Sequence, residues 1–338
     1  MAYSDSNRIN DTNYVEPHAI SLRPDQRVLI AVDGGGTRTQ CAIFDESGRL
    51  LAQAEAGPSN HLVLDAEQAF ASLKQAIRTV MAACGAETSQ VYAISAGLAG
   101  VDAGGEGLVE AHRCLESLGF ANNIIHADIV TAHAGAFGGE PGVLALAGTG
   151  SAFIGVTQDG QHIHAGGWGP AWGDEGSAYW IGRESLRAAA AAHDGRGPKT
   201  ILVELICETL GLANFAETLH TIYRASTQVR LIADLSRVTE MASNTNSDFV
   251  AHDILKRTGE ELACGVEAVV RRMASPVEEC QVSWEGSVLR NSAVVREQFR
   301  SSLGRRMLGI SILPPRFDPV YGAYLIGRRV LDAEANKK

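Results

Sequence analysis

The sequence lacks an apolar run that approaches the roughly 20 residues of a membrane-spanning helix. It also lacks an excess of positive charge, because its 338 residues carry a formal net charge of −10. A surface that binds nucleic acid or an anionic membrane needs clustered lysine and arginine. These two absences predict a protein that binds neither a membrane nor nucleic acid, and they favour a small-molecule partner.

Cysteines with the spacing of a metal or redox site are also missing. No C-x-x-C occurs, and no histidine pair lies near a cysteine. Free cysteine is commonly buried, so we expect small buried side chains in a reducing cytoplasm at Cys41, Cys84, Cys114, Cys207, Cys264 and Cys280. The ten histidines form no ligand-spaced cluster, and we interpret His126, His162 and His164 as strand residues.

The length of the chain indicates two domains, because a single hydrophobic core stops growing beyond about 250–300 residues. Hydrophobic residues make up 45% of the sequence, enough for two cores. Residues 1–26 are polar and lack the charged-then-apolar pattern of a secretion signal. We therefore expect a flexible tail there and a cytoplasmic location. A homodimer is compatible with the sequence, which does not fix the oligomeric state.

Two glycine-rich segments of the chain have the same build. Apolar runs at 28–32, 40–44 and 50–55 predict a three-stranded meander, with GGGTRT between its first two strands. Residues 142–167 repeat the order of strand, Gly/Thr turn, strand, Asp-Gly turn and strand. Two copies of one hairpin predict two related domains that face each other.

Helices are predicted by apolar residues at helical spacing, and the first follows a capping-box pattern at Asp65 and Gln68. Short apolar runs predict further strands at 123–128 and 280–288. The other predicted helices lie at about 108–118, 177–192, 200–210, 248–273 and 319–333.

Each Gly/Thr turn is a possible phosphate site. Glycine lets backbone N–H groups approach an anion closely, and threonine adds a hydroxyl donor. Taken alone, GGGTRT is equally well a tight hairpin without a ligand. The second turn, AGTGS at 147–151, favours phosphate binding, because two such tips can hold a triphosphate between two domains.

Two aspartates follow apolar strands. Asp33 precedes the first turn, where a carboxylate beside phosphates suits Mg²⁺, although it could instead cap its own turn. Asp128 ends the strand NIIHAD, at the strand end where open α/β sheets bind ligands. It could accept the proton of an attacking hydroxyl or cap the next helix, and the two roles are compatible.

Three further segments carry polar or aromatic residues in glycine-rich surroundings. Residues 165–182, AGGWGPAWGDEGSAYWIG, offer aromatic faces and carboxylate acceptors, which suit a sugar, but they also read as a capped loop with a tryptophan core. The segment PSNHL at 58–62 is a weak signal, since its asparagine reads as a turn residue. WEGSV at 284–288 is either a turn that a nucleoside can approach or a plain turn.

Taken in order, DGGGTRT, AGTGS, GGWGPAWGDEGSAYWIG, DGRGP and EGSV resemble the motifs of N-acetylglucosamine kinases grouped with the BadF/BadG/BcrA/BcrD ATPases. These belong to the sugar kinase branch of the actin-like ATPases. The resemblance covers about 28–328. It implies an α/β fold of two actin-like (ribonuclease H-like) domains, each a five-stranded mixed sheet with helices, around a central cleft. The last helix would return to the first domain, which would comprise 27–138 plus 322–338, with 139–321 as the second.

The resemblance also implies a role for each matching position. Asp128 would be the catalytic base and would also contact the sugar, and Asp33 would lie near the metal. The other implied residues contact either the sugar or the nucleotide: Asn60, Gly167, Trp168, Gly169 and Asp174 for the sugar, and Gly35, Gly36, Thr37, Thr149, Gly150, Ala242, Gly286 and Ser287 for ATP. At Ala242 the surrounding MASNTNSD departs from the usual Gly-Asp ending of the motif.

We therefore expect an ATP- and Mg²⁺-dependent kinase that phosphorylates the 6-hydroxyl of N-acetylglucosamine. Glucosamine is the nearest alternative acceptor. An ATPase that activates a radical enzyme would need closely placed cysteine ligands for an iron–sulfur cluster. A non-catalytic sugar sensor would have no use for Asp128 as a base.

Overall fold

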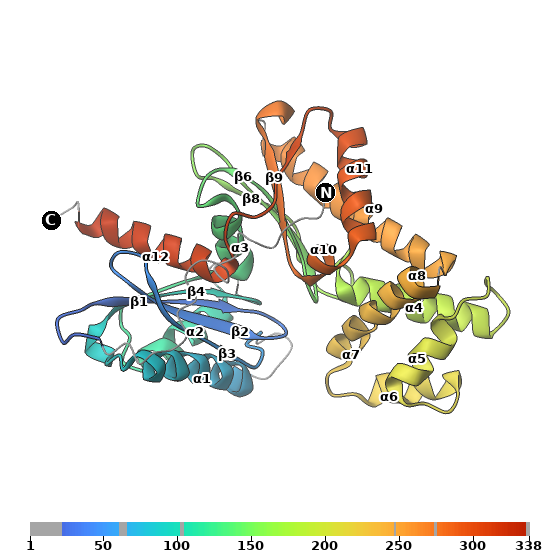
Figure 1. The fold of residues 1–338 in the computed structure, drawn as a ribbon, viewed down its shortest axis with the longest axis horizontal. Helices are drawn as coiled ribbons and strands as arrows, with labels where there is room; N and C mark the ends of the chain where they lie inside the picture. Colours follow the sequence, from blue (N-terminus) through green and yellow to red (C-terminus); the bar gives the residue numbers. More distant parts are fainter. Residues whose placement is uncertain (1–21, 61–65, 102–104, 247, 274–275, 336–338) are drawn as a thin grey trace. The chain divides into compact units, whose positions relative to one another are not determined.

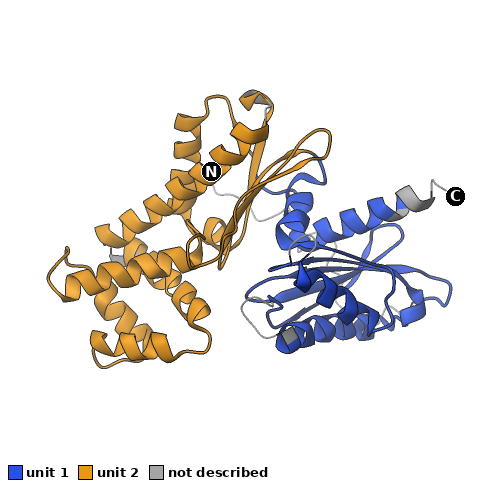
Figure 2. Ribbon diagram, turned by 180° about the vertical axis from the view of Figure 1, so that it is seen from behind, with its two compact units in different colours: residues 1–140, 314–338 blue, residues 141–313 orange. Residues whose placement is uncertain are grey.

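The computed structural model describes the chain in five stretches: 22–60, 66–101, 105–246, 248–273 and 276–335. The chain divides into two compact units, residues 1–140 with 314–338 (unit 1) and residues 141–313 (unit 2), shown in Figure 2. Most of the predicted tail and the capping residue Asp65 lie outside the described residues.

The chain returns to unit 1 at residue 314. The sequence predicted that this return begins at residue 322. The backbone N–H groups of Arg316 and Phe317 donate to the carbonyls of Ala136 and Gly135, at 3.0 and 3.1 Å. The chain therefore already packs against unit 1 before its last helix begins. The first division, at 140/141, lies close to the expected 138/139.

Unit 1 contains one five-stranded sheet in the order β3-β2-β1-β4-β5. The first three strands form the predicted antiparallel meander, and β4 and β5 run parallel to β1. Its strands and helices are β1 Val28–Gly34, β2 Thr39–Asp45, β3 Leu50–Ala56, α1 Ala66–Cys84, β4 Val91–Leu98, α2 Glu106–Glu116, β5 Asn123–Ala127, α3 Asp128–Phe137 and α12 Pro319–Ala335.

Both faces of the unit 1 sheet are covered, so its central strand is apolar on both sides. Val28, Ile30 and Val32 pack in one cluster with residues of α1 and α2. The alternate residues Leu29 and Ala31 pack with α12 on the other face. Figure 1 shows α12 and α1 on opposite faces of this sheet. This period-2 alternation of the strand decides which helix each residue of β1 meets.

Unit 2 repeats the sheet of unit 1. Its order is β10-β9-β6-β7-β8, with β6 antiparallel to β7, β7 antiparallel to β8, and β9 and β10 parallel to β6. Its elements are β6 Gly142–Ala147, β7 Ser151–Val156, β8 His162–Gly166, α4 Ala178–His193, α5 Leu202–Leu210, α6 Thr218–Arg224, α7 Gln228–Asp234, α8 Ser236–Asn246, α9 Phe249–Met273, β9 Gln281–Glu285, α10 Ser287–Asn291, α11 Ala293–Arg306 and β10 Ser311–Ile312.

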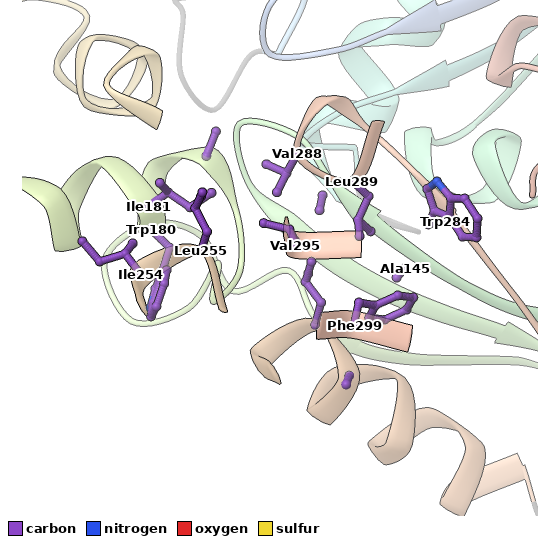
Figure 3. Close-up of a cluster of buried hydrophobic side chains, with 14 of the residues drawn as sticks. Ala145, Trp180, Ile181, Ile254, Leu255, Trp284, Val288, Leu289, Val295 and Phe299 are labelled. Carbon is purple, nitrogen blue, oxygen red and sulfur yellow. The ribbon is translucent and has the colours of Figure 1, made fainter. Parts of the chain in front are cut away.

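The predicted repeat of one hairpin therefore extends to a whole sheet, and the α/β fold of two five-stranded mixed sheets is confirmed. Unit 2 differs in its larger helical layer. Figure 3 shows its core, where Val288 and Leu289 of α10, Val295 and Phe299 of α11 and Trp284 of β9 gather. Each fully buried side chain of this size contributes about 1.5–3 kcal/mol to the free energy of unfolding.

The expectation of buried cysteines is wrong at Cys264, which is exposed, and Cys207 is half-buried. Cys264 lies on α9, whose buried stripe includes Leu262, Ala263 and Val266. The helical period of 3.6 residues turns position 264 away from that stripe. The other four cysteines are buried as predicted. In the parts of the chain that the structure describes, no helix is long and apolar enough to cross a membrane.

Candidate active site

The ends of three parallel strands meet at one edge of the unit 1 sheet. The register pairs Gly34 of β1 with Leu98 of β4, and Leu98 with Ala127 of β5. Asp33 lies one residue before this row and Asp128 one residue after it. Since neighbouring strands are about 4.8 Å apart, the ends of β1 and β5 lie about 10 Å apart. The fold thus brings the two aspartates singled out in the sequence to the same edge.

Asp128 is the first residue of α3, where the sequence predicted the last residue of a strand. β5 ends at Ala127, whose extended backbone makes it the N-cap of the helix. Asp128 is half-buried. Removal of water from the carboxylate raises its pKa to about 6, and hydrogen bonds from the backbone N–H groups of Ile129 and Asp128 oppose that rise. A base with such a pKa is mostly ionised at neutral pH and can still accept a proton effectively.

The first Gly/Thr turn joins β1 to β2 and is held by the loop after β3. Gly35 N–H donates to the Arg38 carbonyl at 2.9 Å, and Ser59 N–H donates to the Gly35 carbonyl at 3.1 Å. A Cβ at Gly34 would overlap Ser59 Oγ. Asn60, the predicted sugar contact, therefore follows a residue that is anchored to the predicted phosphate turn.

Ser59 was not identified in the sequence as a functional residue. Its side chain is 3% exposed, and its Oγ has no hydrogen-bond partner among the described residues. A buried hydroxyl without a partner is unfavourable by about 1–3 kcal/mol. The weak PSNHL signal pointed to this loop, but only the tertiary contact with Gly34 distinguishes Ser59 within it.

The second Gly/Thr turn joins β6 to β7 and is held by the start of α4. Gly148 N–H donates to the Gly150 carbonyl at 2.9 Å. The N–H groups of Ala178 and Tyr179 donate to the carbonyls of Gly148 and Thr149, at 2.9 and 3.2 Å. These bonds satisfy two N–H groups of the first turn of the helix, which have no partner within it, and they fix the turn that contains Thr149 and Gly150.

Asp174 contacts this second turn. A Cβ at Gly150 would lie 2.9 Å from Asp174 Oδ2, and Ser151 N–H donates to Asp174 Oδ1 at 3.3 Å. Asp174 is 7% exposed, and its burial raises the pKa of its carboxyl, opposed by the Ser151 N–H. Among the described residues it alone, glycines aside, has a positive φ, 61°. Such strain in a buried acid is typical of functional sites.

The glycine-tryptophan loop continues from β8 toward Asp174. Gly167 N–H donates to the Ser151 carbonyl at 3.0 Å, which extends the β7–β8 pairing by one residue. Trp168 and Trp172 are 70% and 76% exposed, and Gly169 has φ 79°. The alternative interpretation as core residues is therefore wrong for Trp168 and Trp172, but it is right for Trp180, which is buried in the unit 2 core behind the helix cap Ser177. Exposed indole rings are available to cover the apolar face of a sugar.

The end of β9 lies against the same turn. A Cβ at Gly286, whose φ is 102°, would overlap the Ala147 carbonyl oxygen and lie 2.9 Å from Gly148 N. Ser287 then starts α10. Glu285, which is 7% exposed, accepts hydrogen bonds from Gly286 N–H at 3.0 Å and from the Arg290 guanidinium. The sequence pattern indicated the turn but not this ion pair.

Ala242 does not share this arrangement. It lies on α8, is fully buried in the core of unit 2, and its carbonyl accepts from Asp248 N–H at 3.1 Å. The predicted contact between Ala242 and adenine therefore has no support from the geometry of unit 2.

The remaining predicted residues of unit 2 gather around the Gly148–Gly150 turn, and those of unit 1 around the edge of its sheet. Gly36 and Thr37 lie at the tip of the first turn, half-buried and exposed respectively.

The fold and these two groups of residues define an α/β protein with one sheet in duplicate, a Gly/Thr turn in each copy, and acidic residues at a parallel strand end. The sequence profile of the BadF/BadG/BcrA/BcrD ATPase family matches residues 30–327. The chain belongs to this family, and the predicted resemblance is confirmed.

Individual relatives align over nearly the whole chain. An N-acetylmuramic acid/N-acetylglucosamine kinase of Clostridium acetobutylicum is 31% identical over 90% of this chain and all of its own. An N-acetyl-D-glucosamine kinase of Dictyostelium discoideum is 28% identical over 89% of this chain and 98% of its own. A solved structure from Chromobacterium violaceum, described as a candidate N-acetylglucosamine kinase, has a TM-score of 0.73 and 28% identity, covering 90% of this chain and all of its own.

Proposed function

We propose that the protein is an ATP-dependent kinase that transfers the γ-phosphoryl group to the 6-hydroxyl of N-acetylglucosamine. The observation that carries this proposal is the half-buried Asp128, with a pKa of about 6, at the strand edge that also contains Asp33. The chain-long similarity to two kinases named for N-acetylglucosamine supports this acceptor.

Asp128 is proposed to orient the acceptor hydroxyl and to take its proton as the oxygen attacks the γ-phosphorus atom. The leaving group is ADP, and no covalent enzyme intermediate is required. Phosphoryl transfer depends mainly on positioning and on neutralising charge. Each Gly/Thr turn offers backbone N–H groups and a threonine hydroxyl, Thr37 in one and Thr149 in the other, to phosphate oxygens.

Asp33 has the chemistry of a Mg²⁺ ligand. Its carboxylate is half-buried at the end of β1, directly before the glycine turn. Mg²⁺ prefers carboxylate and phosphate oxygens and keeps part of its water shell, so one carboxylate beside the turn fits. When bound, the ion would neutralise phosphate charge. A cytoplasmic location, where MgATP is abundant, stays a prediction, as does a homodimer.

Asn60, Asp174 and the segment Gly167–Gly169 are proposed to bind the sugar. Asp174 is a fixed acceptor for a sugar hydroxyl, because Ser151 N–H donates to its Oδ1 and Ser177 N–H donates to its carbonyl at 3.1 Å. Trp168 offers an exposed ring for the apolar sugar face. These roles rest on the matching motif and on the local geometry within each unit.

The first test is ADP release on mixing the protein with ATP, Mg²⁺ and a panel of sugars. N-acetylglucosamine is expected to give the highest kcat/KM. Glucosamine and N-acetylmuramic acid belong in the panel because relatives are named for them. A higher kcat/KM for either would change the acceptor within the proposal. If no sugar stimulates ADP release, the protein is not a sugar kinase, and sugar binding measured by calorimetry would then favour a sensor.

A further inference from the structure

A glycine of β4 lies beneath the helix that begins with Asp128. The register places Asp33, Gly97 and His126 side by side on β1, β4 and β5. Ala96 and Leu98 belong to the cluster on the α1 face of the sheet. Successive residues of a strand point to opposite faces, so Gly97 faces the other side, where α3 packs on β4.

α3 approaches β4 so closely at Gly97 that no larger residue fits. A Cβ at Gly97 would overlap Thr131 Oγ1 and lie 2.7 Å from Thr131 Cγ2. Atoms at such distances must move apart, so the missing side chain permits this approach. Thr131 is fully buried, and its Oγ1 donates a hydrogen bond to the Asp128 carbonyl at 2.9 Å.

The same residue is held from the opposite side by α12. A Cβ at Gly322 would overlap the Thr131 carbonyl oxygen and lie 3.0 Å from Gly135 Cα. Thr131 therefore has strand backbone beneath its side chain and helix backbone against its carbonyl. Such contact on two sides leaves the first turn of α3 little freedom to shift, since packed interiors are close to rigid.

We propose that Thr131 is a positioning residue for Asp128: seated on Gly97, it fixes the first turn of α3 and with it the direction of the Asp128 carboxylate. This inference rests on the proposed function, in which Asp128 is the base. The hydroxyl matters because Asp128 is the first residue of its helix, where the backbone is least constrained by helical bonds. A displacement of about 1 Å of a catalytic group can lower a rate about 100-fold.

The alternative is that the Thr131 hydroxyl only finds a hydrogen-bond acceptor within its own buried helix, as threonine often does, and has no effect on Asp128. A control is available in unit 2. Thr218 is 7% exposed at the start of α6, and its Oγ1 donates to the carbonyl three residues back, Phe215, at 2.6 Å. It thus matches Thr131 in burial and bonding, but it lies outside the candidate site.

The experiment compares Thr131→Val, Thr131→Ser and Thr218→Val by kcat, by KM for the sugar and for ATP, and by Tm. Thr131→Val is expected to lower kcat at least about tenfold with both KM values within about twofold, because binding groups stay in place while the base moves. Thr131→Ser keeps the hydroxyl and is expected to keep kcat. Thr218→Val is expected to lower Tm and leave kcat unchanged. If Thr131→Val cannot be purified folded, Thr131→Ala removes the hydroxyl without crowding.

The contact can also be disturbed from the strand, without altering α3. Gly97→Ala is expected to lower kcat in the same way as Thr131→Val. Its control is Gly155→Ala in β7, where a Cβ would lie 2.6 Å from Val269 Cγ1. That change should lower Tm and leave kcat intact.

Asp128→Asn belongs in the same series as a reference. If Asp128→Asn loses turnover while Thr131→Val and Gly97→Ala keep wild-type kcat, the positioning role is wrong and the proposed function stands. If Asp128→Asn itself keeps wild-type turnover, both the base and its positioning residue are wrong.

Discussion

The two sheets have the same strand order and polarity, but they present different chemistry at corresponding places. In both units the Gly/Thr turn follows the first strand, and the predicted sugar contacts follow the third, at Asn60 after β3 and at Gly167–Asp174 after β8. The supports differ, because the first turn is held by a loop through Ser59 and the second by the start of α4. The two copies of the sheet therefore place the predicted contact residues at corresponding positions but hold them with different contacts.

The acidic residues at the strand ends differ between the two units. The residue before the last of β1 is Asp33, whereas the same place in β6 is Leu146. β5 leads into Asp128, whereas β10 is followed by Leu313 and two prolines. Unit 1 thus contains the candidate base and the candidate metal ligand. Unit 2 contains Asp174, the buried acidic residue that is proposed to bind the sugar.

The largest effect is expected from Asp128→Asn, which removes the base from the only unit that has a carboxylate at this place. Its kcat should fall by about two to four decades, the usual contribution of a general base. The KM for ATP should change little, because the turns that contact phosphate remain. Steady-state ADP release with N-acetylglucosamine measures both. Near-wild-type turnover would show that the difference between the strand ends has no catalytic meaning.

A smaller effect is expected from Asp174→Ala in unit 2. Loss of a charged hydrogen-bond acceptor is worth about 1.5–3 kcal/mol, so the KM for the sugar should rise about 10- to 100-fold, more than the KM for ATP. Asp174→Asn retains an oxygen for the Ser151 N–H and is expected to lie between Ala and wild type. An equal rise in both KM values would instead assign Asp174 to the architecture of the turn.

The pH dependence of kcat/KM should follow the ionisation of Asp128 in unit 1. The base works as a carboxylate, so the rate is lost as pH falls through the pKa of about 6 and is fully present above it. At pH 5 about a tenth of the carboxylate is ionised, and the rate should be about tenfold below its plateau. The residual rate of Asp128→Asn should lack this step. If the rate of Asp128→Asn falls at the same pH as that of the wild type, the titrating group is a residue other than Asp128.

The smallest effect concerns stability and compares the two turns directly. Gly150→Ala would place a Cβ 2.9 Å from the Asp174 carboxylate, whereas a Cβ at Gly35 would meet only the Arg38 carbonyl at 3.4 Å. Overpacking of this kind costs about 1–3 kcal/mol, so Gly150→Ala should lower Tm by several degrees. Gly35→Ala should stay within about 0.5 kcal/mol of wild type. Equal shifts in thermal unfolding would contradict the different anchoring of the turns.

Local pattern was sufficient to predict much of the fold. The apolar run at 28–32 and the duplicated hairpin predicted the strands and the repeat, because short apolar runs and turn chemistry act over a few residues. The same local information failed at Cys264, since burial depends on which face of α9 the packing selects. It also placed Asp128 at the end of a strand, because the boundary between β5 and α3 falls within a single residue.

By itself, the sequence determined the chemistry available to this protein: which residues can bind phosphate, accept a proton or cover a sugar, and in which order they occur. The tertiary structure decided which of them meet. Only parallel pairing of β1, β4 and β5 brings Asp33 and Asp128 to one edge, and only the fold shows why residue 97 is glycine and why Ser59 and Thr131 matter. Such contacts join residues far apart in the chain, and their distances are set by packing, which no local pattern encodes.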